Sequence, residues 1–324
     1  MLLSSNNGNK TFKTFKSVEN FNFCGIMAVM TSTVYSEMIS PKQFGQVIGM
    51  SESSLKRWID SGHLQVTRTI GGHRRISVKE ALRFIRTRSL EVKDSSPLKL
   101  SINTDSFSTD DCNSLFLHYL KEGMSEDARQ LLFNEFIKGA TIAELGDDAI
   151  RPALDTLSLE GNEPENIFIE HRATQICIQS IQFLHELVAP DKTLFNAVGG
   201  AISADIYALP SMLVAAVIEE NYGTAVNLGP NTPFDVFRSA SVLLDKKEQP
   251  DLVWVSISQL DNPVEISKEL SIFAHECNEN KIPLLVGGRS VNGLILDPQL
   301  NLTLHTSLKD IDLELLFSST DILL

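Results

Sequence analysis

The residues with the clearest chemical use form one short string, RTIGGHRR, at positions 68–75. Its guanidinium groups can donate charge-assisted hydrogen bonds to phosphate oxygens, and its imidazole can donate one more. Its glycine pair permits a tight turn with a positive φ angle. The string therefore predicts a β-hairpin that presents His73, Arg74 and Arg75 to a phosphate backbone or to a minor groove.

Two short helices are expected before this hairpin and one after it. The first begins with the capping box at 40–43, which has Pro41 at the first helical position, and ends at Gly49. Ser51 is expected to cap the second helix, and another capping box begins the third at Ser77. Apolar spacing buries one face of the second helix. This leaves polar side chains that can enter a major groove: Ser53, Ser54, Lys56 and Arg57.

Charge is distributed unevenly along the 324 residues, which carry a net charge of −13. Residues 31–93 contain eleven Lys and Arg side chains but only five Asp and Glu side chains. Most of the excess negative charge therefore lies behind residue 93. A basic segment on an acidic body predicts one module that binds phosphate and another that does not.

The basic segment resembles the MerR/excisionase family of DNA-binding proteins. The similarity rests on Ser40-Pro41 through Gly49 and Ser51, on Leu55-Lys56-Arg57-Trp58, on Gly62-His63-Leu64 and on the string at 68–75. It implies a winged helix-turn-helix domain over residues 39–90. The DNA-binding residues that it implies are Ser51, Ser53, Ser54, Lys56, Arg57, Arg68, Thr69, Gly71, Gly72, His73, Arg74 and Arg75.

Two further modules are expected behind a linker that is rich in Ser, Thr and Asp, at residues 91–111. Residues 112–189 show helical spacing in four segments, which predicts a four-helix bundle. Residues 190–324 alternate between strands and helices, which predicts an α/β domain with a Rossmann-like (flavodoxin-like) parallel sheet. The expected strands lie at 193–198, 224–228, 252–257, 283–286 and 302–305, and the expected helices near 208–221, 233–245 and 263–280.

Small and polar residues follow two of these strands. Ser256 and Ser258 come at the end of the third strand, where open α/β sheets bind ligands, although they also suit a helix entry. Gly287 and Gly288 follow the fourth strand. This glycine pair suits either the approach of a ligand to the backbone or a tight strand-to-helix turn.

The order of the three modules resembles cobalamin-dependent, light-responsive regulators that repress carotenoid synthesis genes. Gly287-Gly288 and the stretch 228–233 are similar to that family's glycine pair and second-strand exit, and Glu170-His171 are similar to the end of its bundle signature. The family's cobalt-binding motif has His and Gly at the positions of Tyr207 and Pro210, and only its acid, Asp205, is kept. The Trp of the bundle signature is also absent.

These departures lead us to expect no bound cofactor, because a neutral phenol is a poor substitute for imidazole as a cobalt ligand. Adenosylcobalamin without a lower His ligand, or haem, remains an alternative. His171 is then either a pocket residue or a hydrogen-bonded His within the bundle. The candidate cofactor-binding residues are Glu170, His171, Asp205, Tyr207, Ser256, Ser258, Gly287 and Gly288.

The sequence gives no sign of a zinc site, a membrane span or a catalytic motif. Residues 1–38 are expected to be a disordered leader, and Met27, Met30 and Met38 are candidate start positions. The four cysteines form no C-x-x-C pair, which favours buried thiols in a reduced cytoplasm over a zinc site. No apolar run reaches the ~20 residues of a membrane span. There is no nucleophile elbow, Walker loop or dinucleotide fingerprint, so we expect no enzyme.

Together these features predict a cytoplasmic, nucleoid-associated transcription regulator, such as a repressor, that binds a double-stranded operator. Because no long heptad run follows the third helix, we expect it to form a homo-oligomer through a surface other than a coiled coil. The acidic C-terminal module is a candidate site for a protein partner. The alternatives are a cobalamin- or haem-dependent sensory regulator and, of a different class, a corrinoid carrier protein.

Overall fold

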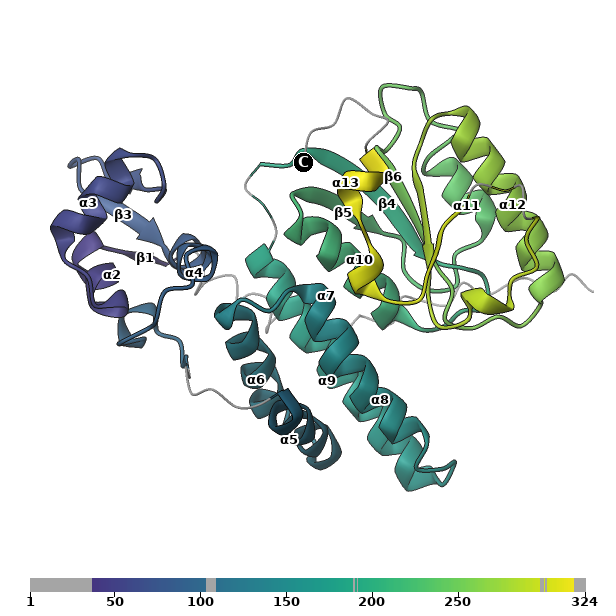
Figure 1. Cartoon of the computed structure of the whole chain (residues 1–324), viewed down its shortest axis with the longest axis horizontal. Coiled ribbons are helices and arrows are strands. Elements are labelled where there is room, and N and C mark those ends of the chain that lie inside the picture. The colour runs from purple at the N-terminus through teal and green to yellow at the C-terminus, as the bar shows by residue number, and fades with distance from the viewer. Residues whose placement is uncertain are drawn as a thin grey trace, which may run out of the picture.

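The computed structural model describes residues 37–102, 109–188, 190, 192–297, 300 and 302–317. The expected leader lies outside the described residues except for its last two positions, and so does the 103–108 part of the expected linker. Figure 1 shows three parts in chain order, which are a small N-terminal unit, a group of long helices and a sheet covered by helices.

The N-terminal unit combines three helices with a small antiparallel sheet. Its elements are β1 (Met38–Ile39), α2 (Pro41–Ile48), α3 (Glu52–Asp60), β2 (Thr67–Arg68), β3 (Arg74–Ser77) and α4 (Val78–Thr87). The strand order is β1-β3-β2. Phe44, Leu55 and Phe84 are buried at its centre. We call residues 37–100 the head.

The expected linker begins later than residue 91, because the head extends beyond α4. The backbone N–H of Lys93 donates to the carbonyl of Val47 at 2.7 Å. A 3-10 turn, η1 (Ser96–Leu98), then places Leu98 in the core with no exposed surface. Residues 91–100 therefore pack against α2 as part of the head, which a polar composition does not reveal.

Four helical segments form the second part. They are α5 (Thr109–Glu122), α6 (Ser125–Lys138), a composite third segment and α9 (Pro164–Val188). The third segment runs through α7 (Ile142–Glu144), a π-helical stretch η2 (Leu145–Ile150) and α8 (Arg151–Ser158). We call residues 109–188 the bundle. Its first helix begins at Thr109, three residues before the expected start.

The third part is a parallel sheet of five strands, as expected. The strands are β4 (Phe195–Ala201), β5 (Gly223–Asn227), β6 (Leu252–Ser256), β7 (Leu284–Gly287) and β8 (Leu304–His305), in the order β5-β4-β6-β7-β8. Each overlaps one of the five expected strands, with ends that differ by up to three residues. The order reverses between β4 and β6, and this switch point is where open sheets bind ligands.

Helices cover both faces of this sheet. The side chains of α11 (Phe234–Ser239) and α12 (Pro263–Glu279) pack on one face. Those of α10 (Ala208–Glu220) and α13 (Leu313–Phe317) pack on the other. The helix expected near 233–245 is wrong in length. The helix ends at Ser239 and is followed by turns. Val242 and Leu244 are half-buried in these turns, and Leu243 is exposed, so these residues do not form a buried helical face.

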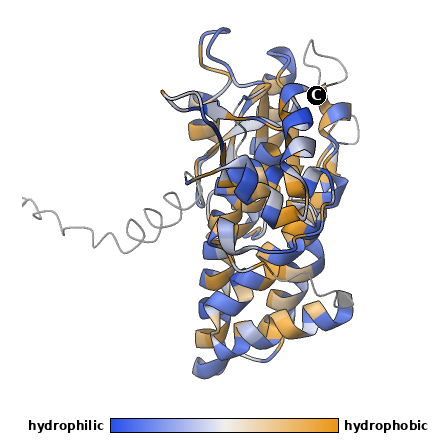
Figure 2. Ribbon diagram, turned by 90° about the vertical axis from the view of Figure 1, so that its left-hand side faces the viewer, coloured by the Kyte–Doolittle hydropathy of each residue, from blue (hydrophilic) through white to orange (hydrophobic). Residues whose placement is uncertain are grey.

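One apolar core runs without a break from the head through the bundle to α10. It includes Phe84 of α4, Phe136 of α6 and Val217 of α10. Figure 2 shows the corresponding pattern, with hydrophobic and hydrophilic stripes alternating on the helices. Among the described residues, no helix combines the length and apolar character needed to cross a bilayer.

The cysteines within the described residues behave as buried hydrophobes. Cys112, Cys177 and Cys277 are free thiols in the interior, and burial raises the pKa of Cys177 and of Cys277 to about 12. Cys24 lies outside the described residues.

Candidate nucleic-acid interface and ligand pocket

The helix ends of the head form as their sequences indicate. The Ser40 hydroxyl accepts from the Gln43 N–H at 3.2 Å, and the Gln43 side chain accepts from the Ser40 N–H at 2.9 Å. The Ser51 hydroxyl caps α3 by accepting from the Ser54 N–H at 3.3 Å. It also lies 2.8 Å from the Ser53 hydroxyl. Ser51 therefore positions the start of α3, and its hydroxyl is already occupied by local contacts.

The string at 68–75 forms a hairpin between β2 and β3, in which Arg68 pairs with Arg74. The Thr69 N–H donates to the His73 carbonyl at 3.0 Å, and the Gly72 N–H donates to the Thr69 carbonyl at 2.8 Å. Gly72 has φ 78°, which explains why glycine stands there. Gly71 lies beside it in the turn, and Ile70 projects from the tip with its side chain fully exposed. We call residues 67–77 the wing.

Some basic side chains of the head are exposed to solvent, and others are held in ion pairs. Lys56 and Arg57 of α3 are exposed, as are Arg68 and His73 of the wing, and Arg75 is half-buried. Arg74 is different, because its guanidinium donates to the Asp60 carboxylate of α3 at 2.6 Å. Arg74 thus joins the wing to α3, and sequence spacing gave no sign of this pairing.

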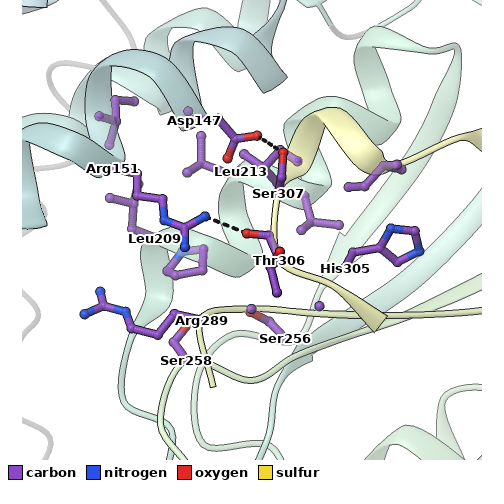
Figure 3. Close-up of a pocket in the computed structure, with 18 of the residues that line it drawn as sticks. Asp147, Arg151, Leu209, Leu213, Ser256, Ser258, Arg289, His305, Thr306 and Ser307 are labelled. Carbon is purple, nitrogen blue, oxygen red and sulfur yellow. Dashed lines mark hydrogen bonds between the residues drawn. The ribbon is translucent and has the colours of Figure 1, made fainter. Parts of the chain in front are cut away.

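A pocket lies between the bundle and the carboxyl edge of the sheet, as Figure 3 shows. Its cavity volume is about 130 Å³. The first turns of α10 contribute Leu209 and Leu213, and the bundle contributes Ile150 and Leu154. Trp254 of β6 forms part of the sheet wall. An apolar lining with a few polar groups is typical of sites for small ligands.

Polar contacts join the bundle to the segment after β8 at one side of this pocket. Arg151 donates to the Thr306 carbonyl at 2.5 Å, and the Ser307 hydroxyl donates to Asp147 at 2.6 Å (Figure 3). The Lys309 N–H also donates to Asp147, at 3.0 Å. The pocket is therefore built by contacts between residues 155 and 160 positions apart in the chain.

Four of the expected cofactor residues line this pocket: Ser256, Ser258, Gly287 and Gly288. A Cβ atom at Gly288 would lie 2.3 Å from the Ile257 carbonyl oxygen, and one at Gly287 would lie 2.9 Å from that of His305. The glycines therefore allow neighbouring loops of the protein to approach each other.

Asp205 and Tyr207 lie outside the pocket lining. The Asp205 carboxylate is fully buried and accepts three backbone N–H groups, from Tyr207 at 3.0 Å, Ser258 at 2.5 Å and Gln259 at 3.3 Å. Burial raises its pKa, and the hydrogen bonds from Ser258, Tyr207 and Gln259 oppose this. Asp205 therefore holds two loops together. The guanidinium of Arg289 stands 5.8 Å from the centre of the Tyr207 ring.

Glu170 and His171 are not brought to the pocket. Both lie in the first turns of α9, and neither is among the residues that line the pocket. Their assignment to a ligand site therefore stays a prediction. The bundle residues that do line it, including Asp147, Arg151 and Asp155, come from η2 and α8.

Sequence reasoning missed these residues, and it also missed Arg289 and His305. Arg289 follows the glycine pair after β7, and His305 ends β8. The rule that ligands bind beyond the carboxyl ends of parallel strands would have pointed to both. No comparable rule marks η2. Among the described residues, no group of three or more His, Cys, Asp or Glu side chains is placed to hold a metal ion.

No family model and no curated protein matches the chain. Among solved structures, it is similar to the monomethylamine corrinoid protein of Methanosarcina barkeri, at 12% identity and a TM-score of 0.45, covering 62% of this chain and 94% of that one. A cobalamin-binding protein of Desulfitobacterium hafniense DCB-2 gives 12% identity, a TM-score of 0.30 and coverages of 62% and 95%. The methanol:cobalamin methyltransferase complex MtaBC of Methanosarcina barkeri gives 19% identity and a TM-score of 0.26, covering 75% of this chain and 82% of that one. At these values no function or residue role is carried over.

The described residues do not fit a cobalamin held from below by His. Position 207 offers a phenol in place of an imidazole, and the Asp205 carboxylate already accepts three backbone N–H groups. We expect the purified chain, incubated with adenosylcobalamin in the dark and separated by gel filtration, to carry no stoichiometric cobalamin absorbance. Stoichiometric absorbance in the protein fraction would contradict this, and its loss in Leu213→Trp would then locate the ligand in the pocket.

Proposed function

We propose that this chain is a sequence-specific DNA-binding transcription regulator that binds operator DNA through the head. In this proposal residues 39–90 act as a winged helix-turn-helix of the MerR type, with α3 in a major groove and the wing on the adjacent backbone or minor groove. The protein acts as a homo-oligomer in the cytoplasm, at the nucleoid, and has no catalytic activity.

The observation that carries the proposal is the set of basic side chains left free on one helix and one hairpin. Within the described part of the chain, no ion pair forms at Lys56, Arg57, Arg68 or Arg75. The Arg74–Asp60 pair ties the wing to α3, so both present their side chains together. Unpaired cations on a preformed surface are what phosphate binding requires.

The tip of the wing adds a second feature that suits DNA. Ile70 is an aliphatic side chain with no contact to bury it, and the basic residues Arg68 and His73 flank it. Proteins that bind the minor groove often place apolar side chains against or between base pairs, with arginines beside them. We infer that Ile70 contacts the floor or the walls of a minor groove.

The experiment that tests the function uses the full chain and a pool of random-sequence duplexes. Repeated selection should enrich one sequence class. Binding of an enriched duplex, followed by fluorescence anisotropy, should weaken steeply with salt. Four to five phosphate contacts per head predict a log–log slope of about −4, because each contributes about −0.9. An unenriched pool together with a slope near zero would falsify the proposal.

A second candidate function keeps the head and adds a sensor. The observation that favours it is the apolar pocket at the carboxyl edge of β6, β7 and β8, closed on one side by the bundle. In this version a small apolar ligand, rather than His-ligated cobalamin, controls DNA binding. A corrinoid carrier is disfavoured because the cobalt-binding imidazole that such a protein uses is replaced by Tyr207.

A further inference from the structure

Arg86, near the end of α4, joins the head to both other parts of the molecule. Its Nε donates to the Phe136 carbonyl at 3.1 Å, and its Nη2 donates to the Ala140 carbonyl at 3.1 Å. The same Nη2 donates to Glu220 of α10 at 2.5 Å. The guanidinium also stacks on the Phe136 ring, 4.2 Å from its centre. One side chain of the head thus binds α6 of the bundle and α10 of the sheet domain.

Glu220 completes this arrangement from the other side. It is the last residue of α10, and only 10% of its side chain is exposed. Its second oxygen accepts from the N–H of Ile142, the first residue of α7, at 2.8 Å. Burial raises the pKa of Glu220, and Arg86 and the Ile142 N–H oppose the rise. We call Arg86, Glu220 and the Ile142 N–H the clasp.

Glu220 belongs to α10, which forms one wall of the ligand pocket, and its partner Ile142 belongs to α7, which continues into η2, another wall. The first turns of α10 contribute Leu209 and Leu213, and η2, which continues α7, contributes Gly146 and Ile150. The two walls meet at Gly146, where a Cβ atom would lie 3.4 Å from Leu213 and 2.5 Å from Leu308 of η4 (Leu308–Asp310). Close approach of η2 to α10 and η4 therefore depends on the missing side chain at 146.

We propose that the clasp couples the docking of the head to the closure of η2 against α10, so that widening the pocket between these walls releases the head. The inference rests on the sensor version of the proposed function, because it states how a ligand in that pocket would change the docking of the head. A carboxylate that is largely buried needs both of its partners. When η2 moves away from α10, Glu220 loses the Ile142 N–H and cannot hold Arg86 in the same geometry.

The test is amide hydrogen exchange of the full chain, measured by mass spectrometry without DNA or ligand. Arg86→Met should speed exchange in α4 and at the start of α7 by about tenfold or more, because charge-assisted hydrogen bonds are lost there. Arg86→Lys should restore part of the protection. Gly146→Ala and Gly146→Leu place a small and a large wedge between the walls, and should speed exchange in α4 in that order.

Two matched variants serve as controls. Arg129→Met removes an arginine that pairs with Glu126 and stacks on Phe183 within the bundle, so it repeats the chemical change away from the clasp. Thr156→Leu adds a leucine to the exposed side of α8. Neither should change exchange in α4.

The coupling is wrong if both Gly146 variants speed exchange in η2 and α10 while α4 stays as protected as in the wild type. It is also wrong if Arg86→Met leaves α4 unchanged. Should Gly146→Leu fail to fold, as judged by circular dichroism, Gly146→Ala decides alone. The readout does not involve DNA. Failure of the head to bind duplexes would therefore overturn the proposed function and leave the measured coupling intact.

Discussion

Replacing Lys56 and Arg57 together by alanine is expected to weaken binding of the selected duplex about 100-fold at moderate salt. Both side chains are exposed on α3, and within the described residues neither forms an ion pair. Each lost phosphate contact should make the log–log salt slope shallower by about 0.9, and so by nearly 2 for the pair. Anisotropy titrations at four or more salt concentrations give both quantities.

A matched control separates local contact from net charge. Lys246 and Lys247 are an exposed basic pair after α11 in the sheet domain. Replacing both by alanine removes the same charge from the chain, and should leave the salt slope within experimental error. Equal losses in the two double variants would mean that DNA responds only to overall charge, and α3 would then not be the element that binds it.

Replacing Trp254 by alanine is expected to lower the free energy of unfolding of the sheet domain by about 3–5 kcal/mol. Trp254 is fully buried in β6, and its indole N–H donates to the Ser211 hydroxyl at 3.1 Å. That hydroxyl lies 2.9 Å from the Asn227 side chain and can donate to it. The substitution therefore leaves a cavity and removes a donor from a buried polar chain. Urea unfolding followed by circular dichroism measures the loss.

Trp254→Phe separates the two contributions, because it keeps most of the ring volume and removes only the N–H. We expect a loss of about 1–3 kcal/mol for this variant, the cost of a buried acceptor left without its donor. Both variants keep every residue of the head, so a change in duplex binding at temperatures where they are folded would come through the pocket wall that Trp254 forms. A cost below about 1 kcal/mol for Trp254→Ala would show that this part of the sheet can collapse around the gap.

The local structure of the chain could be predicted from the sequence, because its signals act over a few residues. Serine caps at 40, 51 and 77 begin the three helices of the head, and Gly72 adopts the positive φ that its hairpin requires. The five strands follow from apolar runs bounded by turns. The exposure of Lys56 and Arg57 follows from helical spacing around Leu55.

The grouping of side chains into sites was decided only by the tertiary structure. Asp60 and Arg74 are 14 residues apart, and Arg86 and Glu220 are 134 apart. No local pattern distinguishes these partners from other charged residues. The same holds for Glu170 and His171. Both lie on α9, His171 is exposed, and neither is among the residues that line the pocket, which a sequence motif alone does not show.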